Sequence, residues 1–264
     1  MGGHTNFETI RVEKDGNLGV LTLARPERLN AVDGTMLREL ALAAAWFDDQ
    51  SEIDVVVLRG EGRAFCAGAD LKAMGGASEM NWRQRREAGQ LGRRAMDALE
   101  QMRALTVSQV QGYAVGGGFL LMAACDLRVV AEDAVFFIPE VELGLPLAWG
   151  GVPRMVRELG PALTKELIIT CRRFGPSEVA PMVNRIVPPE RLEEETLDLA
   201  RSLAAMPTVP AAITKDHVNA VCRAISGATD FADGDTLQWV RGDVESEAAR
   251  LRYTERTLGG GRSA

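Results

Sequence analysis

Two segments of the chain combine small residues with positions where a peptide N–H can face a ligand. Three consecutive glycines at 116–118 separate an apolar, strand-like run from an apolar, helix-like run. The segment AFCAGADL (64–71) follows another apolar run and a glycine-rich loop. Small residues permit close packing of a helix on a sheet. They equally permit N–H groups at a helix start to bind a negatively charged atom. Either segment alone leaves both interpretations open.

Together, the two segments favour the chemical interpretation. Each follows a predicted parallel strand, so each can offer one backbone N–H to the same oxygen atom. Two such donors form an oxyanion hole, which stabilises the negative charge that develops on the carbonyl of an ester or thioester.

Further motifs make the chain similar to the crotonase family (enoyl-CoA hydratase/isomerase). AGADL and GYAVGGG occur in the family's order, ARPERLNAVD resembles its RPxxLNA segment, and ACDLRVVAEDAVFFIPEVELGL resembles its CD strand with the following PExxxGL loop. The resemblance extends from about residue 7 to about residue 225. It implies an α/β, ClpP/crotonase-like fold of repeated ββα units with a helical C-terminal region.

The resemblance also implies a substrate and an assembly. The substrate is an acyl-coenzyme A thioester, with coenzyme A as part of the substrate and no separate cofactor. Family members are usually trimers or dimers of trimers. We therefore expect an acyl-CoA-binding core over 1–200 and a helical trimerisation or capping region over 201–264.

Matched position by position, the family's site residues fall on named residues of this chain. The oxyanion donors are the N–H groups of Ala67 and Gly117, and the catalytic acid/base is Glu140. The positions expected to contact substrate are Arg28, Ala31, Gly68, Ala69, Asp70, Leu71, Gly116, Leu120 and Trp149. A role in packing alone is equally open for Trp149.

One position departs from the pattern of the family's hydratases. They carry a second glutamate where this chain has Leu120, flanked by apolar residues. A single base such as Glu140 suits double-bond isomerisation, because it can remove a proton from one carbon and return it to another. Hydration with a non-standard second acid, such as Glu142, is an alternative, although we interpret Glu142 as a solvated loop charge. A weakly catalytic acyl-CoA-binding subunit is the other alternative.

Composition narrows the possible partners and cofactors. The 264-residue chain has a net charge of −7, which argues against a nucleic-acid or anionic-membrane partner. Its four cysteines form no CxxC pair and it has two histidines, so no metal site is expected. Cys66 is interpreted as a packed thiol and His217 as a surface residue. The sequence shows no signal-peptide pattern or membrane span, and we expect a cytoplasmic protein.

The elements that must position these residues follow from apolar periodicity and from helix caps. Strands alternate with helices to about residue 140, and helices dominate thereafter. The predicted strands are 7–13, 18–24, 55–58, 106–110, 127–131 and 135–138. The predicted helices are 33–49, 82–105, 153–159, 163–170, 190–205, 210–224 and 235–257, with a short helix capped by Ser177 and a mobile loop at 74–81.

Overall fold

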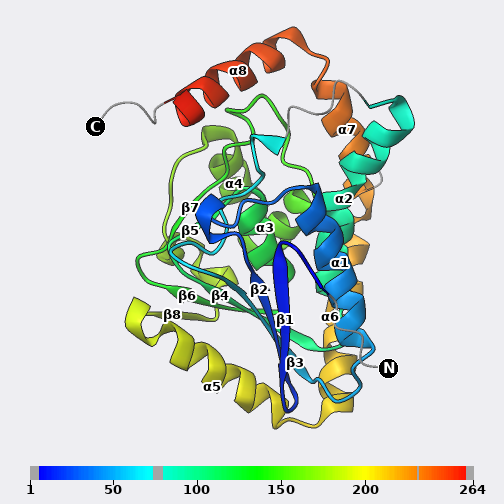
Figure 1. Cartoon of the computed structure of the whole chain (residues 1–264), viewed down its shortest axis with the longest axis vertical. Helices are drawn as coiled ribbons and strands as arrows, with labels where there is room; N and C mark the ends of the chain where they lie inside the picture. Colours follow the sequence, from blue (N-terminus) through cyan, green and yellow to red (C-terminus); the bar gives the residue numbers. More distant parts are fainter. Residues whose placement is uncertain (1–5, 74–79, 231, 260–264) are drawn as a thin grey trace.

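A parallel-dominated sheet forms the centre of the protein in a computed structural model (Figure 1). The structure describes residues 6–73, 80–230 and 232–259. The loop predicted at 74–81 lies outside these residues except for its last two positions.

Six strands form this main sheet, in the order β1-β2-β3-β4-β6-β8. β1 and β2 are antiparallel, and each later neighbour is parallel. β3 carries the continuous apolar run expected of a strand covered on both faces. A second, two-stranded parallel sheet pairs β5 with β7. The strands are β1 (Ile10–Asp15), β2 (Leu18–Leu23), β3 (Val55–Gly60), β4 (Leu105–Val110), β5 (Tyr113–Val115), β6 (Leu127–Ala131), β7 (Val135–Phe137) and β8 (Arg185–Val187).

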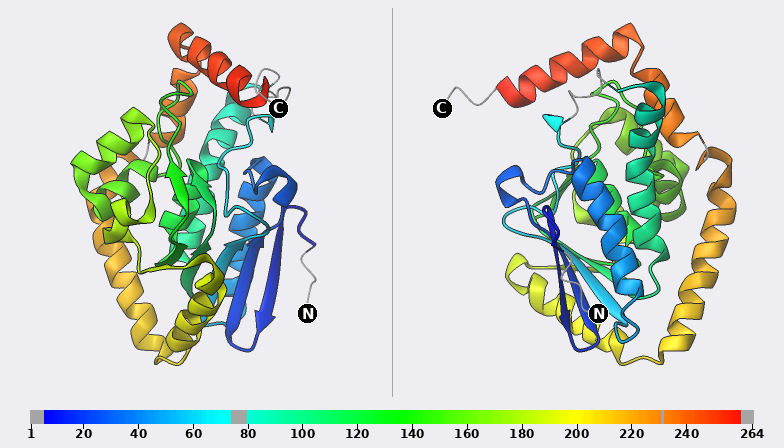
Figure 2. Two further views of the ribbon diagram at one scale, coloured as in Figure 1. Left: turned by 90° about the vertical axis from the view of Figure 1, so that its left-hand side faces the viewer. Right: turned by 45° about the vertical axis from the view of Figure 1, so that its right-hand side comes forward.

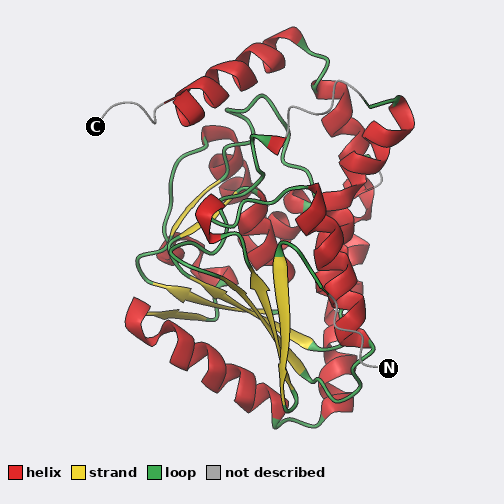
Figure 3. Cartoon of the chain, viewed as in Figure 1, coloured by secondary structure: helices red, strands yellow, loops and turns green. Residues whose placement is uncertain are grey.

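Helices cover both faces of the main sheet (Figure 3). α1, α2 and α3 pack with the larger apolar core on one face, while α5 covers the other. The helices are α1 (Gly34–Asp48), α2 (Trp82–Gln101), α3 (Gly117–Ala124), α4 (Gly151–Thr170), α5 (Leu192–Ala204), α6 (Thr208–Asp230), α7 (Asp233–Val240) and α8 (Val244–Gly259). The short 3₁₀ segments are Pro26–Arg28, Pro176–Met182 and Pro189–Arg191.

The predicted α/β architecture is confirmed, with local differences at the less periodic segments. Strands β5 and β8, of three residues each, were not predicted, because pairing with distant strands defines them. The helix predicted at 235–257 is two helices, since Asp243 accepts a hydrogen bond from the N–H of Ser246 and starts a new one. The break predicted near Gly160 is a kink within α4.

Three aromatic rings fix α3 to the small sheet. Phe119 of α3, Phe136 of β7 and Phe174 pack edge to face, with ring centroids 5.4–5.7 Å apart. All three side chains are buried. This contact holds the start of α3, where the three glycines lie, against the end of the small sheet.

The C-terminal helices return to the sheet-and-helix body. α6 runs along one side, and α7 and α8 lie across one end (Figure 2). α7 meets α2 where Gly89 and Gly234 face each other, and a Cβ on Gly234 would lie 2.9 Å from the Gly89 carbonyl oxygen. The boundary expected at residue 200 falls within α5, which packs on the sheet, and the division into a core and a C-terminal region stays a prediction. The predicted trimeric assembly stays a prediction.

Candidate active site

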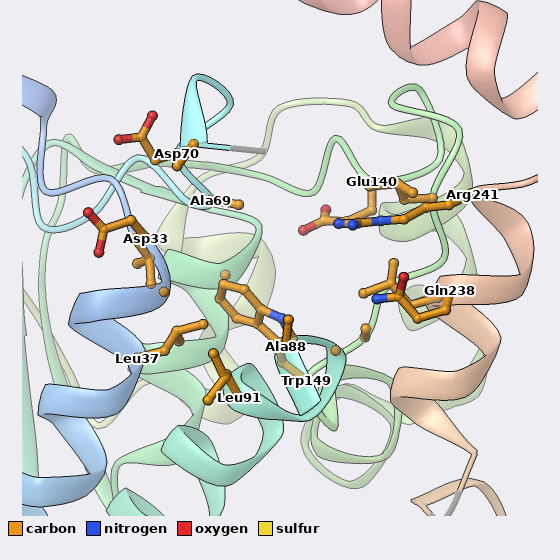
Figure 4. Close-up of a pocket in the computed structure, with 18 of the residues that line it drawn as sticks. Asp33, Leu37, Ala69, Asp70, Ala88, Leu91, Glu140, Trp149, Gln238 and Arg241 are labelled. Atoms are coloured by element: carbon orange, nitrogen blue, oxygen red, sulfur yellow. The ribbon is translucent and has the colours of Figure 1, made fainter. Parts of the chain in front are cut away.

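Two adjoining cavities lie around the two small-residue segments. The inner cavity, of about 250 Å³, is enclosed by α1, α2, α3, α7 and the loop before α4 (Figure 4). The outer cavity, of about 410 Å³, lies between the 64–71 segment, the small sheet and α8. Four residues line both cavities: Ala69, Asp70, Glu140 and Leu143. A ligand that occupies both cavities therefore passes between Ala69 and Glu140.

Each glycine at 116–118 has its own packing neighbour. A Cβ on Gly116 would overlap the Glu140 carboxylate, and one on Gly117 would overlap the Trp149 indole. A Cβ on Gly118 would overlap the Cys66 carbonyl oxygen. The packing interpretation and the chemical interpretation therefore both apply. Close approach brings the carboxylate, the indole and the 64–71 segment to the start of α3.

Asn30 holds the 64–71 segment in place from the preceding loop. Its fully buried side-chain amide donates to the carbonyls of Glu61, Ala64 and Phe65 at 2.9, 2.9 and 3.2 Å, and its side-chain oxygen accepts from the N–H of Arg25. The backbone of Asn30 has a φ of 56°, a conformation that asparagine tolerates. Sequence reasoning did not single out this residue, although it lies in the ARPERLNAVD motif.

The structure contradicts the prediction that Ala67 is an oxyanion donor. The N–H of Ala67 donates to the Leu29 carbonyl oxygen at 2.9 Å, so it is not free for a ligand. Ala69, two residues further on, forms a parallel bridge with Val32, in which Gly68 O and Asp70 N make the hydrogen bonds. Because hydrogen-bonding groups alternate in direction along an extended chain, the Ala69 N–H faces away from Val32.

Two backbone N–H groups at the inner cavity lack an acceptor. Within the part of the chain that the structure describes, neither Ala69 N nor Gly117 N donates a hydrogen bond. Gly117 is the first residue of α3, where N–H groups have no partner within the helix and the helix dipole is positive. Both residues line the inner cavity.

Glu140 lies on the turn after β7, at the junction of the two cavities. Its Oε2 is buried and has no hydrogen-bond partner among the described residues. Burial disfavours the charged form and raises the pKa of Glu140 from 4.5 to about 7, while a hydrogen bond from its own backbone lowers it in part. Such a carboxyl group can both accept and donate a proton near neutral pH.

Apolar side chains form most of the remaining wall of the inner cavity, which Arg38, Arg85, Gln238 and Arg241 also line. Leu120 is 1% exposed and lines the cavity on α3. Trp149 lies across the cavity floor with a φ of 60°, and the Arg154 guanidinium holds this turn by donating to the Trp149 and Gly150 carbonyls at 3.2 Å each. The structure therefore assigns Trp149 both a packing contact, with Gly117, and a place in the cavity wall.

The other nearby carboxylates have basic partners. Asp33 and Asp70 both pair with Arg25, at 3.1 and 2.9 Å. Glu142 is exposed and pairs with Arg256 of α8 at 2.6 Å, which agrees with its interpretation as a solvated loop charge. Among the described residues that line the inner cavity, Glu140 is therefore the carboxylate without an ion-pair partner.

The remaining predicted contact positions gather at the outer cavity. Its lining includes Arg28, Ala31, Ala67, Gly68, Leu71 and Gly116. Three basic side chains from separate segments, Arg28, Lys72 and Arg173, lie at this cavity and are exposed. They supply a local positive charge to a protein that is acidic as a whole.

Other chemical interpretations lose support in the structure. Burial raises the pKa of the Cys66 thiol to about 12, so Cys66 is a packed thiol and not a nucleophile. His217 is exposed on α6 and lines neither cavity. The described residues contain no cluster of three or more potential metal ligands. Within the same residues, no helix has the length and apolar character needed to cross a membrane.

Comparison with known proteins agrees with this geometry. A family profile described as "Enoyl-CoA hydratase/isomerase" matches residues 13–257. A probable enoyl-CoA hydratase of Rhizobium meliloti is 36% identical over 81% of this chain and 82% of its own length. A short-chain-enoyl-CoA hydratase of Clostridium acetobutylicum is 32% identical over the same shares. A crystal structure of an enoyl-CoA hydratase/isomerase from Mycobacterium paratuberculosis covers 94% of this chain and 99% of its own, with 25% identity and a TM-score of 0.86.

This fold, with its two small-residue loops at one site, thus defines a crotonase-type enzyme. The chain belongs to the enoyl-CoA hydratase/isomerase family.

Proposed function

We propose that this protein moves the C=C bond of an enoyl-CoA thioester by proton transfer through Glu140. The observation that carries the proposal is one carboxyl group, with a buried Oε2 and no ion-pair partner among the described residues, that faces a largely apolar cavity in which Leu120 occupies the position of a second acid. The coenzyme A portion would lie in the outer cavity, near Arg28, Lys72 and Arg173, and the acyl portion in the inner cavity.

In this arrangement the thioester carbonyl lies between the unpaired N–H groups of Ala69 and Gly117. Glu140 removes a proton from C2 of a 3-enoyl thioester, and the electrons move toward the carbonyl oxygen to give a dienolate. The two N–H groups stabilise the charge on that oxygen. Glu140 then returns the proton to C4, which leaves the double bond between C2 and C3. No water is consumed, and the base is regenerated.

The pKa of about 7 suits this cycle, because the same group must act first as a base and then as an acid. Water addition needs a further group that orients and deprotonates the water. Three described acids lie near Glu140 in the sequence or line the same cavity: Asp33, Asp70 and Glu142. Each forms an ion pair with an arginine.

Hydration is the second candidate, because the relatives named above are described as hydratases. In that case Glu140 alone, or with a water held by backbone groups, would add water to a 2-enoyl thioester.

A spectroscopic assay separates the candidates. We expect 3-hexenoyl-CoA to gain the absorbance of a conjugated enoyl thioester in the presence of the protein, and crotonyl-CoA to lose little of it. Glu140→Gln should lower the first rate by about 10²-fold or more. Rapid loss of the crotonyl-CoA signal would support hydration instead. Tight binding of the two thioesters without either reaction would support the third interpretation, an acyl-CoA-binding subunit.

A further inference from the structure

Two polar side chains of α7 and its end enter the inner cavity from the side opposite α1. Figure 4 shows Gln238 and Arg241 pointing into the space that Glu140 and Trp149 border. The proton transfer described above uses neither. Their place is fixed by the contact of α7 with α2, where a Cβ on Gly89 would lie 3.0 Å from the Gln238 amide nitrogen.

Arg241 has no counter-charge among the residues that the structure describes. Its Nε is buried without a hydrogen-bond partner, and it forms no ion pair with those residues. The charged group that acts on it is another cation, Arg250, whose Nη1 is also buried without a partner. Burial and the neighbouring Arg250 lower the pKa of Arg241. Both arginines are half-buried, and in each one guanidinium nitrogen is removed from water without a hydrogen-bond partner among the described residues.

The carboxylates of the inner cavity do not supply this anion. Asp33 and Asp70 already pair with Arg25. Glu140 and Arg241 form no ion pair in the described structure, since Glu140 Oε2 and Arg241 Nε both lack a partner, and desolvation accordingly raises the pKa of Glu140. Arg241 and Glu140 therefore line one cavity without neutralising each other, and a negatively charged ligand atom near Arg241 would be stabilised strongly.

We propose that the acyl group taken by this enzyme ends in a carboxylate, which Arg241 binds with help from the Gln238 amide. This inference rests on the proposed function, because it places the acyl group in the inner cavity. The substrate class is the coenzyme A monothioester of a short unsaturated dicarboxylic acid. A guanidinium matches a carboxylate with two parallel hydrogen bonds, and the apolar wall of Leu37, Leu91 and Leu120 suits the carbons between the two ends. Because Gly117, Glu140 and Arg241 line the same cavity, a short chain suffices to join the thioester to a terminal carboxylate at Arg241.

Binding of saturated thioesters tests the carboxylate site without any reaction. Hexanedioyl-CoA and hexanoyl-CoA have the same chain length and differ in the terminal group. Calorimetry should show tighter binding of the hexanedioyl ester by on the order of 10- to 100-fold, as expected for charge-assisted hydrogen bonds. Arg241→Leu should abolish the difference, Arg241→Lys should keep part of it, and Gln238→Leu should reduce it.

The control variant is Arg252→Leu, which removes an exposed arginine of α8 that lines neither cavity. It should leave both affinities unchanged. Circular dichroism and the melting temperature show whether each variant is folded. If the wild type binds both esters equally, or if Arg241→Leu weakens both by the same factor, the proposal is overturned, because Arg241 would then serve no terminal carboxylate.

Turnover of 3-hexenedioyl-CoA and 3-hexenoyl-CoA separates this inference from the proposed function. Both hold if the diacid ester reacts with the higher kcat/KM and Arg241→Leu removes the preference. Preferential binding of the hexanedioyl ester without turnover of either alkene leaves the carboxylate site intact and refutes isomerisation. Turnover of both alkenes with equal kcat/KM and equal binding of the saturated esters refutes the carboxylate site alone.

Discussion

The indole of Trp149 lies against the α-carbon of Gly117, in space that a side chain at position 117 would occupy. The ring therefore supports the first turn of α3 from the cavity side, next to the N–H that we propose as an oxyanion donor. Leu120, one turn further along α3, faces the same cavity. Because the ring and the helix start are in contact, a change in either one moves the other.

Replacing Gly117 should therefore disable catalysis. In Gly117→Ala the new methyl group would collide with the indole, and the helix start or the ring would have to shift. We expect kcat for the 3-enoyl thioester to fall by about 10²-fold or more, the range seen when one oxyanion donor is lost. Gly175→Ala is the matched control, because a Cβ there would meet no atom within 4 Å and the residue has a φ of −108°. Its kcat should remain at the wild-type level, and an equal loss in both variants would contradict this explanation.

The assignment of Ala69 in place of Ala67 can be tested by replacing single peptide N–H groups with ester oxygens. Such a change at Ala69 removes an N–H without a protein acceptor, so kcat should fall by about 10²-fold, while stability should fall only as far as the weaker ester carbonyl of Gly68 loosens its hydrogen bond from Val32. The same change at Ala67 removes its hydrogen bond to Leu29, so unfolding should become easier by about 1 kcal/mol. Steady-state kinetics and thermal unfolding measure the two effects. The opposite pattern would restore Ala67 as the donor.

The pKa of Glu140 predicts how both activity and stability vary with pH. Proton abstraction needs the carboxylate, so kcat/KM should rise with pH and level off above about 7. Between 4.5 and about 7 the folded protein binds more protons at this group than the unfolded chain does. The free energy of unfolding should therefore fall as pH rises through this window, by on the order of 3 kcal/mol from this group.

Glu140→Gln should remove that contribution, so its stability relative to the wild type should increase from pH 5 to pH 8. Chemical unfolding at a series of pH values measures the difference. A constant difference would show that Glu140 titrates normally.

A second acid at position 120 should favour hydration. Leu120→Glu places a carboxyl group on α3 in the same cavity as Glu140, and we expect measurable water addition to crotonyl-CoA. Because Leu120 is 1% exposed, burying this group should destabilise the protein by about 1–3 kcal/mol. Leu120→Gln has a similar shape without the acid and should gain no hydratase activity. Equal activity in the two variants would show that the acid at this position is not what hydration lacks.

Much of the fold follows from local patterns. The apolar run of β3 appears where it was predicted, and so does the start of the helix predicted at 33–49, where Asp33 accepts a hydrogen bond from the N–H of Met36. Long amphipathic helices such as α2 are also recovered. The short strands β5 and β8 were not predicted, because they form through hydrogen bonds to strands distant in the sequence.

The sequence by itself determined the types of groups at the site: the small-residue loops, Glu140, and Leu120 in place of an acid. These depend on residue identity and spacing, which the chain carries locally. The tertiary structure decided which N–H groups remain free, because the Leu29 carbonyl from another loop accepts from Ala67 and not from Ala69. It also decided that Arg241, far along the chain, enters the cavity of Glu140. Hydrogen-bond pairing and burial are properties of segments brought together by folding, and no local pattern specifies them.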